Sequence, residues 1–178
     1  QSIQSYNEAT EYDLVLASYV LNEVQGDDII SLIETYRERC AGVMVILEPG
    51  TPQGARLIAR IREHVSSLND AHILGPCPQS GLCPLKDFEK RWCHFSARVE
   101  RSRRHKHLKG GEAGYEDEKF SWLAVSRKPS ENMPSYRVIG HPTGTGVRQL
   151  QVCGKDGKAE NLNIAKSHPQ YKKARKAE

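Results

Sequence analysis

Long apolar runs are missing from this 178-residue sequence. A membrane-spanning helix needs about 18 or more consecutive apolar residues, and no stretch of the chain comes near that length. Hydrophobic residues make up 38% of the sequence, which is enough for one buried core in a chain of this size. No secretory signal is visible. We therefore expect a soluble protein with no membrane partner.

The signatures of a nucleotide-dependent enzyme are also missing. Such a cofactor site needs a glycine-rich turn directly after the first strand, and almost no chain precedes Tyr12 to supply one. The segment 144–146 (Gly-Thr-Gly) follows no convincing strand and lacks the third glycine. No nucleophile–base pair is recognisable, and the acidic residues 116–118 are more typical of a turn or of salt-bridge partners than of a catalytic pair. The sequence thus favours a binding protein over an enzyme.

Cysteine is the residue type whose arrangement is most informative. Five cysteines without a secretory signal are poor evidence for a disulfide framework, and a reducing compartment favours metal ligation. Cys40 stands apart as the odd thiol. The four expected metal ligands are Cys77, Cys83, Cys93 and Cys153.

The spacing of these four cysteines indicates which metal group they hold. Five residues separate the first two, nine separate the next pair and 59 precede the last. Zinc sites usually pair ligands two to four residues apart. The wider spacing favours a 4Fe-4S cluster, with zinc as the alternative. His94 is adjacent to Cys93, and we expect it to pack near the site instead of replacing a cysteine.

A basic segment follows the cysteine-rich loop. Seven Arg or Lys residues and one acid, Glu100, lie between residues 91 and 109. Such a local excess of positive charge neutralises phosphates and gives salt-sensitive nucleic-acid binding. The last residues, 171–176, form a second basic segment, a helix or a disordered arm. The predicted RNA-binding residues are Arg98, Arg101, Arg103, Arg104, Lys106, Lys109, Lys172, Lys173 and Arg175.

Residues 12–68 have the pattern of an α/β unit. The apolar runs 14–17 and 43–47 predict buried strands. A helix is expected between them, with Ile29, Leu32, Ile33, Tyr36 and Cys40 on one face and Gly42 at its end. A second helix follows residue 54, and short connections between the elements predict a parallel sheet.

The carboxyl ends of the predicted strands carry polar side chains. Ligands of parallel sheets bind at these ends, which here include Ser18, Asn22 and Glu48. Turn and cap roles for these residues are an equally good interpretation. Helical and strand periodicity disappears between residues 71 and 114, and strand patterns return at 120–125 and 147–152. We therefore divide the chain into an α/β unit (1–70), a cysteine-rich, basic insertion (71–114) and closing strands with a basic tail (115–178).

Several unusual segments occur together in this chain. They are YDLVLASYVLNE (12–23), EPGTPQG (48–54), CPQSGLCPL (77–85), WCHFS (92–96), YEDEKF (115–120), VCGKDG (152–157), KS (166–167) and YKKARK (171–176). In this order they resemble the methyltransferase-like family of the mitochondrial small ribosomal subunit, the family of methyltransferase-like protein 17 with its fungal and bacterial relatives. The resemblance covers nearly the whole chain.

The resemblance implies the later half of a class I methyltransferase-type Rossmann sheet, with a cluster-binding insertion and a short C-terminal β region. It implies that Cys77, Cys83, Cys93 and Cys153 hold a four-iron four-sulfur cluster. It also implies association with small-subunit rRNA and ribosomal proteins, as an assembly factor or a lasting component. The expected compartment is the mitochondrial matrix, with a bacterial cytoplasm as the alternative.

The chain departs from the family pattern at its start, which corresponds to a point near the fourth strand of the family domain. An S-adenosylmethionine pocket cannot be built from this chain alone, so another chain or segment is expected to complete the Rossmann domain. We predict an rRNA-binding protein stabilised by an iron–sulfur cluster. The alternatives are an S-adenosylmethionine-dependent rRNA methyltransferase, with Ser18, Asn22 and Glu48 at the edge of its pocket, and a zinc-stabilised ribosomal protein.

Overall fold

The computed structural model describes residues 11–24, 26, 28–85, 92–102, 114–139 and 142–176, which form two β-sheets. The larger sheet contains β1 (Tyr12–Ser18), β2 (Cys40–Pro49), β3 (His72–Gly75), β4 (Phe95–Glu100) and β5 (Tyr115–Ser126). The smaller sheet contains β6 (Tyr136–Val138), β7 (Val147–Gly154) and β8 (Ala159–Ala165). The helices are α1 (Asp28–Glu38), α2 (Pro52–Ser66) and α4 (Tyr171–Ala174), with a 3₁₀ turn at Leu21–Glu23.

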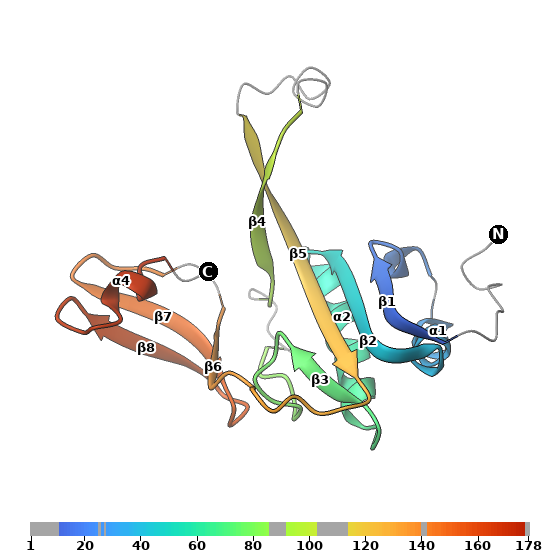
Figure 1. The fold of residues 1–178 in the computed structure, drawn as a ribbon. Coiled ribbons are helices and arrows are strands. Elements are labelled where there is room, and N and C mark those ends of the chain that lie inside the picture. The colour runs from blue at the N-terminus through green and yellow to red at the C-terminus, as the bar shows by residue number, and fades with distance from the viewer. Residues whose placement is uncertain are drawn as a thin grey trace.

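The larger sheet is mixed, in the strand order β1-β2-β5-β3. β1 and β2 pair in parallel, which confirms the α/β unit expected from the sequence. β5 lies antiparallel between β2 and β3, so the parallel pairing predicted for residues 12–68 holds for β1 and β2 while the complete sheet is mixed. Figure 1 shows α1 and α2 behind the strands of this sheet. The buried side chains between helices and strands include Ile33, Met44, Ile46, Ile61, Val65 and Leu123.

The first helix ends earlier than the sequence pattern predicted. α1 stops at Glu38, and Cys40 is the first residue of β2 instead of the last residue on the helix face. Gly42 lies inside β2 and does not end the helix. A Cβ atom at Gly42 would lie 2.1 Å from the carbonyl oxygen of Asp13, so glycine is required by the close approach of two strands.

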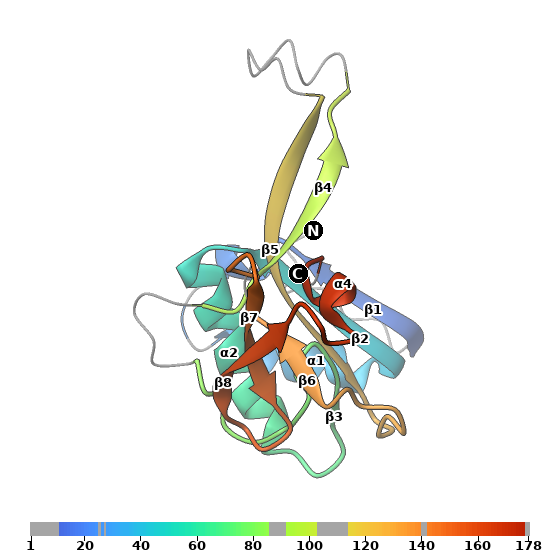
Figure 2. The same ribbon diagram turned by 90° about the vertical axis from the view of Figure 1, so that its left-hand side faces the viewer.

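β5 is longer than the strands it pairs with, and its two halves belong to different parts of the sheet. Its second half pairs with β2, whereas its first half pairs antiparallel with β4. The β4–β5 pair extends away from the helices as a two-stranded arm, as Figures 1 and 2 show. Most side chains at its outer end, such as Val99 and Tyr115, are exposed. The arm therefore presents surface on both faces.

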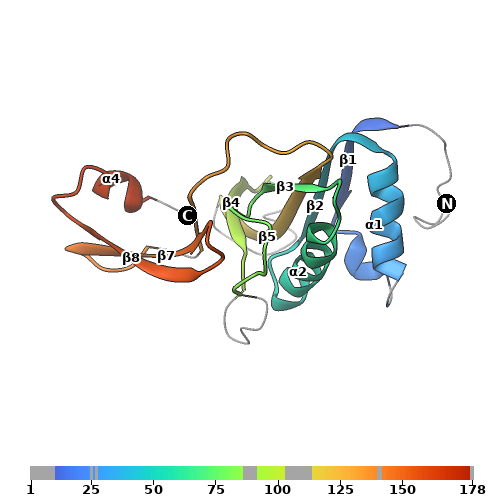
Figure 3. The ribbon, with the colours of Figure 1, turned by 90° about the horizontal axis from the view of Figure 1, so that it is seen from below.

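The smaller sheet has a hydrophobic cluster of its own. Leu150 and Val152 of β7 pack against Ala174 of α4, and this cluster is separate from the main core. Figure 3 shows the smaller sheet and α4 beside the main sheet, on the side away from α1. The connection from β5 to β6 joins the two parts, and the cysteine-lined cavity described below also lies between them.

Candidate functional site

All four predicted ligand cysteines line one cavity. Cys77 and Cys83 lie on the loop after β3, Cys93 lies just before β4, and Cys153 lies on β7 of the smaller sheet. The cavity has a volume of about 50 Å³, several times the roughly 10–15 Å³ that one water molecule needs. The thiols therefore border a shared space. The fifth cysteine, Cys40, is buried in the main core, as its exclusion from the ligand set requires.

Two hydrogen bonds between side chains and backbone carbonyl groups hold the segment around Cys93 in place. The Ser121 hydroxyl on β5 donates to the Cys93 carbonyl oxygen at 2.9 Å. The neighbouring Trp92 indole donates to the carbonyl oxygen of Gly50, in the turn between β2 and α2, at 2.9 Å. His94 contacts the Trp92 ring and lies outside the cavity lining, which agrees with the packing role expected for it.

Burial makes ionisation of the isolated thiols difficult. Burial raises the pKa of Cys77 and of Cys93, and the adjacent thiols raise both further, while nearby arginines lower them. The pKa of Cys153 rises to about 11 because of burial and then of repulsion from the other three cysteines. Metal ligands must be thiolates, so a cation in the cavity is needed to keep four of them charged together.

The thiols do not surround a single point. Among the described residues, which include all four cysteines, no three His, Cys, Asp or Glu side chains are arranged to hold one metal ion. Ligands of one zinc ion each lie about 2.3 Å from it and hence within about 4 Å of one another. The four thiols thus share one cavity without forming a recognisable single-ion site among the described residues.

The described part of the basic segment is paired with acids across the arm. Arg98 donates to both carboxylate oxygens of Asp117, at 2.8 and 3.0 Å, and lies over the Tyr115 ring. Arg101 forms a 3.0 Å ion pair with Glu116. Glu116 lies 15 residues after Arg101 and Asp117 lies 19 residues after Arg98, so a count over residues 91–109 could not include them. The other predicted contacts of this segment lie outside the described residues; they are Arg103, Arg104, Lys106 and Lys109.

The C-terminal basic residues lie on an open groove around α4. It is lined by the three tail residues that were predicted to bind RNA, Lys172, Lys173 and Arg175. Lys166, His168 and Lys176 line the same groove, although the sequence reasoning did not assign them to the site. The groove is fixed to the smaller sheet because Ala174 is buried there and the Tyr171 hydroxyl donates to the Thr145 carbonyl oxygen at 2.6 Å. It is thus a concentrated positive surface on a packed scaffold.

Of the three strand-end residues, Glu48 has a clear structural role. Its carboxylate is fully buried and accepts a 3.0 Å hydrogen bond from the Leu21 backbone N–H. Burial raises the pKa of Glu48, although the backbone N–H groups of Leu21 and Asn22 lower it. Glu48 therefore secures the turn after β1, while the Asn22 side chain is exposed and Ser18 is half-buried.

Comparison with known proteins places these features in a family. The model of the family described as "Mitochondrial small ribosomal subunit Rsm22" matches residues 1–178. The chain belongs to the Rsm22 family. This confirms the resemblance stated from the sequence motifs and the mitochondrial location expected with it.

Two curated relatives support the assignment. Rsm22-cox11 tandem proteins 1 and 2, both named mitochondrial and both from Schizosaccharomyces pombe, are each 34% identical to the chain over 86 residues. The match covers 42% of this chain and 11% of each relative, so the chain spans a small part of their length. No helix in the described part of this Rsm22-family chain is long and apolar enough to cross a membrane.

Proposed function

We propose that this chain is an rRNA-binding part of a small-ribosomal-subunit protein or assembly factor of the mitochondrion, stabilised by an iron–sulfur cluster. The groove around α4 carries the RNA-binding part of the proposal. Six cationic or titratable side chains line it: Lys166, His168, Lys172, Lys173, Arg175 and Lys176. Dense positive charge on a fixed surface binds phosphates by releasing counterions. Family membership favours ribosomal RNA as the source of these phosphates.

The test is binding of the chain to small-subunit rRNA fragments at several salt concentrations. The double variant Lys172→Glu/Lys173→Glu changes two exposed side chains. We expect affinity to fall by about tenfold or more. The slope of log affinity against log salt concentration should become shallower by the equivalent of about two phosphate contacts.

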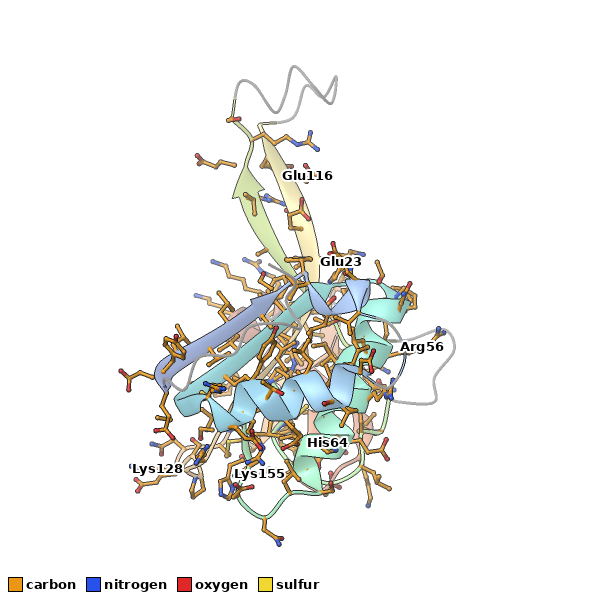
Figure 4. All side chains as sticks on the ribbon, turned by 90° about the vertical axis from the view of Figure 1, so that its right-hand side faces the viewer. Glu23, Arg56, His64, Glu116, Lys128 and Lys155 are labelled. Atoms are coloured by element: carbon orange, nitrogen blue, oxygen red, sulfur yellow. The ribbon has the colours of Figure 1, made fainter. Side chains whose placement is uncertain are left out.

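A control with the same change in charge separates local contact from net charge. Lys128 and Lys155 are exposed and neither lines the α4 groove, and Figure 4 shows both far from the outer end of the arm as well, where Glu116 lies. The double variant Lys128→Glu/Lys155→Glu should bind nearly as the unchanged protein does. Equal loss in both double variants would contradict a binding site at the α4 groove.

The chemistry of the donors supports the cluster part of the proposal. Cys77, Cys83, Cys93 and Cys153 supply the four thiolates that a 4Fe-4S cluster requires, and they share one cavity. Their wide spacing along the chain, five, nine and 59 residues, supports a four-iron cluster over one zinc ion, whose ligands usually come in pairs two to four residues apart. When bound, such a cluster would cross-link the loop after β3, the start of β4 and β7.

Elemental analysis of anaerobically purified protein tests this directly. We expect about four iron and four sulfide per chain, with visible absorbance, and loss of both in Cys83→Ser. About one zinc per chain without sulfide would support the zinc-stabilised alternative. Absence of both metals from the purified protein would refute a metal-holding role for the cavity.

We also propose that the larger sheet is the later half of a class I methyltransferase-type sheet, to which another segment or chain adds at β1. The parallel pair β1–β2, with α1 after the first strand and α2 after the second, is the repeating unit of such a sheet. Parallel strands are normally covered on both faces, yet Leu14 and Leu16 of the edge strand β1 are 60% and 59% exposed. Methyl transfer forms no part of the proposal, because Glu48 serves the turn after β1.

A further inference from the structure

Two arginines from different parts of the fold face the cysteine-lined cavity. Arg62, on α2, is only 3% exposed. Its Nε donates to the Cys77 sulfur at 3.2 Å, and its Nη2 donates to the Gln79 carbonyl oxygen at 2.9 Å. A guanidinium from the helix thus holds the loop that carries the first two cysteines.

Arg137, on β6, reaches the cavity from the smaller sheet. Its guanidinium carbon lies 3.3 Å from the centre of the Phe95 ring. Arg137 lines the same cavity as Cys77, Cys93 and Cys153. Its Nε is buried and has no hydrogen-bond partner among the described residues. At least one N–H donor of Arg137 therefore has no acceptor among the described residues.

Neither arginine has an acidic partner in the described part of the chain. The ion pairs found there involve other arginines, lysines and a histidine, and no carboxylate pairs with Arg62 or Arg137. Burying a charge without an opposite charge is expensive, so buried guanidinium groups normally face an anion. Arg62 is 3% exposed, both arginines line the cavity, and no described carboxylate faces either of them. The two arginines therefore match an occupant of the cavity that carries negative charge.

We propose that Arg62 and Arg137 supply the positive charge that allows an anionic iron–sulfur cluster to be held in this cavity, and that they raise its reduction potential. The inference rests on the proposed function. Four thiolates around the usual oxidised core of a four-iron cluster leave a net charge of about minus two. The two guanidinium groups balance that charge. They are positioning residues, because they act on the cluster through charge and hydrogen bonds and are not its ligands.

The test measures bound iron and sulfide and the midpoint potential of the cluster in the full chain. Arg62→Gln and Arg137→Gln each remove one positive charge, whereas Arg62→Lys and Arg137→Lys keep it. The matched control is Arg56→Gln, an exposed position on the same helix as Arg62 (Figure 4). We expect each Gln variant to lower the equilibrium constant for reduction by about tenfold, or about 59 mV for one electron. The Lys variants should shift the potential less than half as far, and the control should not shift it.

A second readout separates charge balance from ordinary packing. Thermal unfolding of loaded and iron-free protein is compared for each Gln variant. In the iron-free form, removal of the charge loses only the hydrogen bonds of the guanidinium, whereas in the loaded form it also loses the charge balance with the cluster, so the loaded form should be destabilised more. A purely structural arginine would give the same loss in both forms.

The outcomes distinguish this inference from the cluster proposal. Failure of the unchanged protein to bind iron and sulfide would refute the cluster itself. Normal loading and an unchanged potential in both Gln variants would overturn the role of the arginines. Equal shifts in Gln and Lys variants would also overturn it, because charge would then not be the cause. Where a Gln variant fails to fold or load, loading of the matching Lys variant supports the proposal, and failure of that variant contradicts it.

Discussion

At the scale of single residues, Glu48 connects the ends of the two parallel strands. It lies on β2, and its carboxylate accepts a hydrogen bond from Leu21 in the turn after β1. Its second oxygen is buried without a hydrogen-bond partner among the described residues. A charged carboxylate in this position is costly, because water is excluded and only part of its hydrogen-bonding capacity is used.

The raised pKa of Glu48 predicts a specific dependence of stability on pH. Burial favours the neutral acid, so the folded protein binds this proton more tightly than the unfolded chain, whose carboxyl has the ordinary value of 4.5. The stability it contributes is complete below pH 4.5 and is lost as pH rises through the folded pKa. As pH rises through that range, the unchanged protein should lose stability while Glu48→Gln does not, so the free energy of unfolding of the variant rises relative to that of the unchanged protein. The difference is about 1.4 kcal/mol for each tenfold difference in proton affinity between the folded and unfolded chains. Urea unfolding at several pH values measures the difference.

Glu34 on α1 offers a matched carboxylate with the opposite behaviour. Burial raises its pKa, but hydrogen bonds from His64 and Arg37 outweigh burial and lower it overall. Its stabilising contribution is present above the ordinary pKa and is lost on acidification. Glu34→Gln should thus lose free energy relative to the unchanged protein as pH rises from acid to neutral. If the difference in unfolding free energy between Glu48→Gln and the unchanged protein did not vary with pH, the pKa of Glu48 would not be raised in the folded protein.

Residue-level charge also marks a limit of sequence reasoning. Arg98 and Arg101 were counted as unpaired positive charge because only Glu100 lies near them in the sequence. In the fold, Asp117 and Glu116 face them across the arm. Pairing between antiparallel strands joins residues far apart in sequence, so a charge count along the chain misses it.

At the scale of elements, short or half-exposed strands were the hardest to foresee. β6 has only three residues, and β8 has no apolar run, although Leu162 and Ile164 alternate with asparagines and pack on the small cluster. β1, β2 and the second half of β5 were foreseen, because they lie in the main core and carry apolar runs. The early end of α1 could not be read from Gly42, whose small size serves the contact with Asp13 instead.

β3 lies in a segment where the sequence pattern predicted no strand. Residues 71–114 were expected to depend on a metal site instead of a hydrophobic core. However, Ile73 of β3 is 3% exposed and belongs to the main core. The loop that carries Cys77 and Cys83 therefore starts from a strand of the main sheet. The main sheet therefore holds the start of this loop without help from a metal.

At the scale of the whole molecule, the cysteines were the most predictable part of the site. Their spacing and the resemblance selected four of five thiols, and these four line one cavity while Cys40 does not. The arginines were not foreseen, because Arg62 and Arg137 lie far from the cysteine loop in sequence and only the tertiary fold brings them to it. The hydrophobic clusters of the larger and the smaller sheet share no residue, and the cavity is lined from both parts of the fold.

This arrangement predicts that the cavity couples the smaller sheet to the larger one. Cys153 is the ligand that the proposed cluster would take from β7, so Cys153→Ser should lose iron and free the smaller sheet from the loop at Cys77. We expect amide exchange in β7 and around Cys77 to accelerate by about tenfold or more, or about 1.4 kcal/mol of local opening free energy. Cys40→Ser is the control, since it buries a hydroxyl in the main core and should lower stability without loss of iron. Acceleration confined to β7, or no acceleration when iron is removed from the unchanged protein, would contradict coupling through a bound cluster.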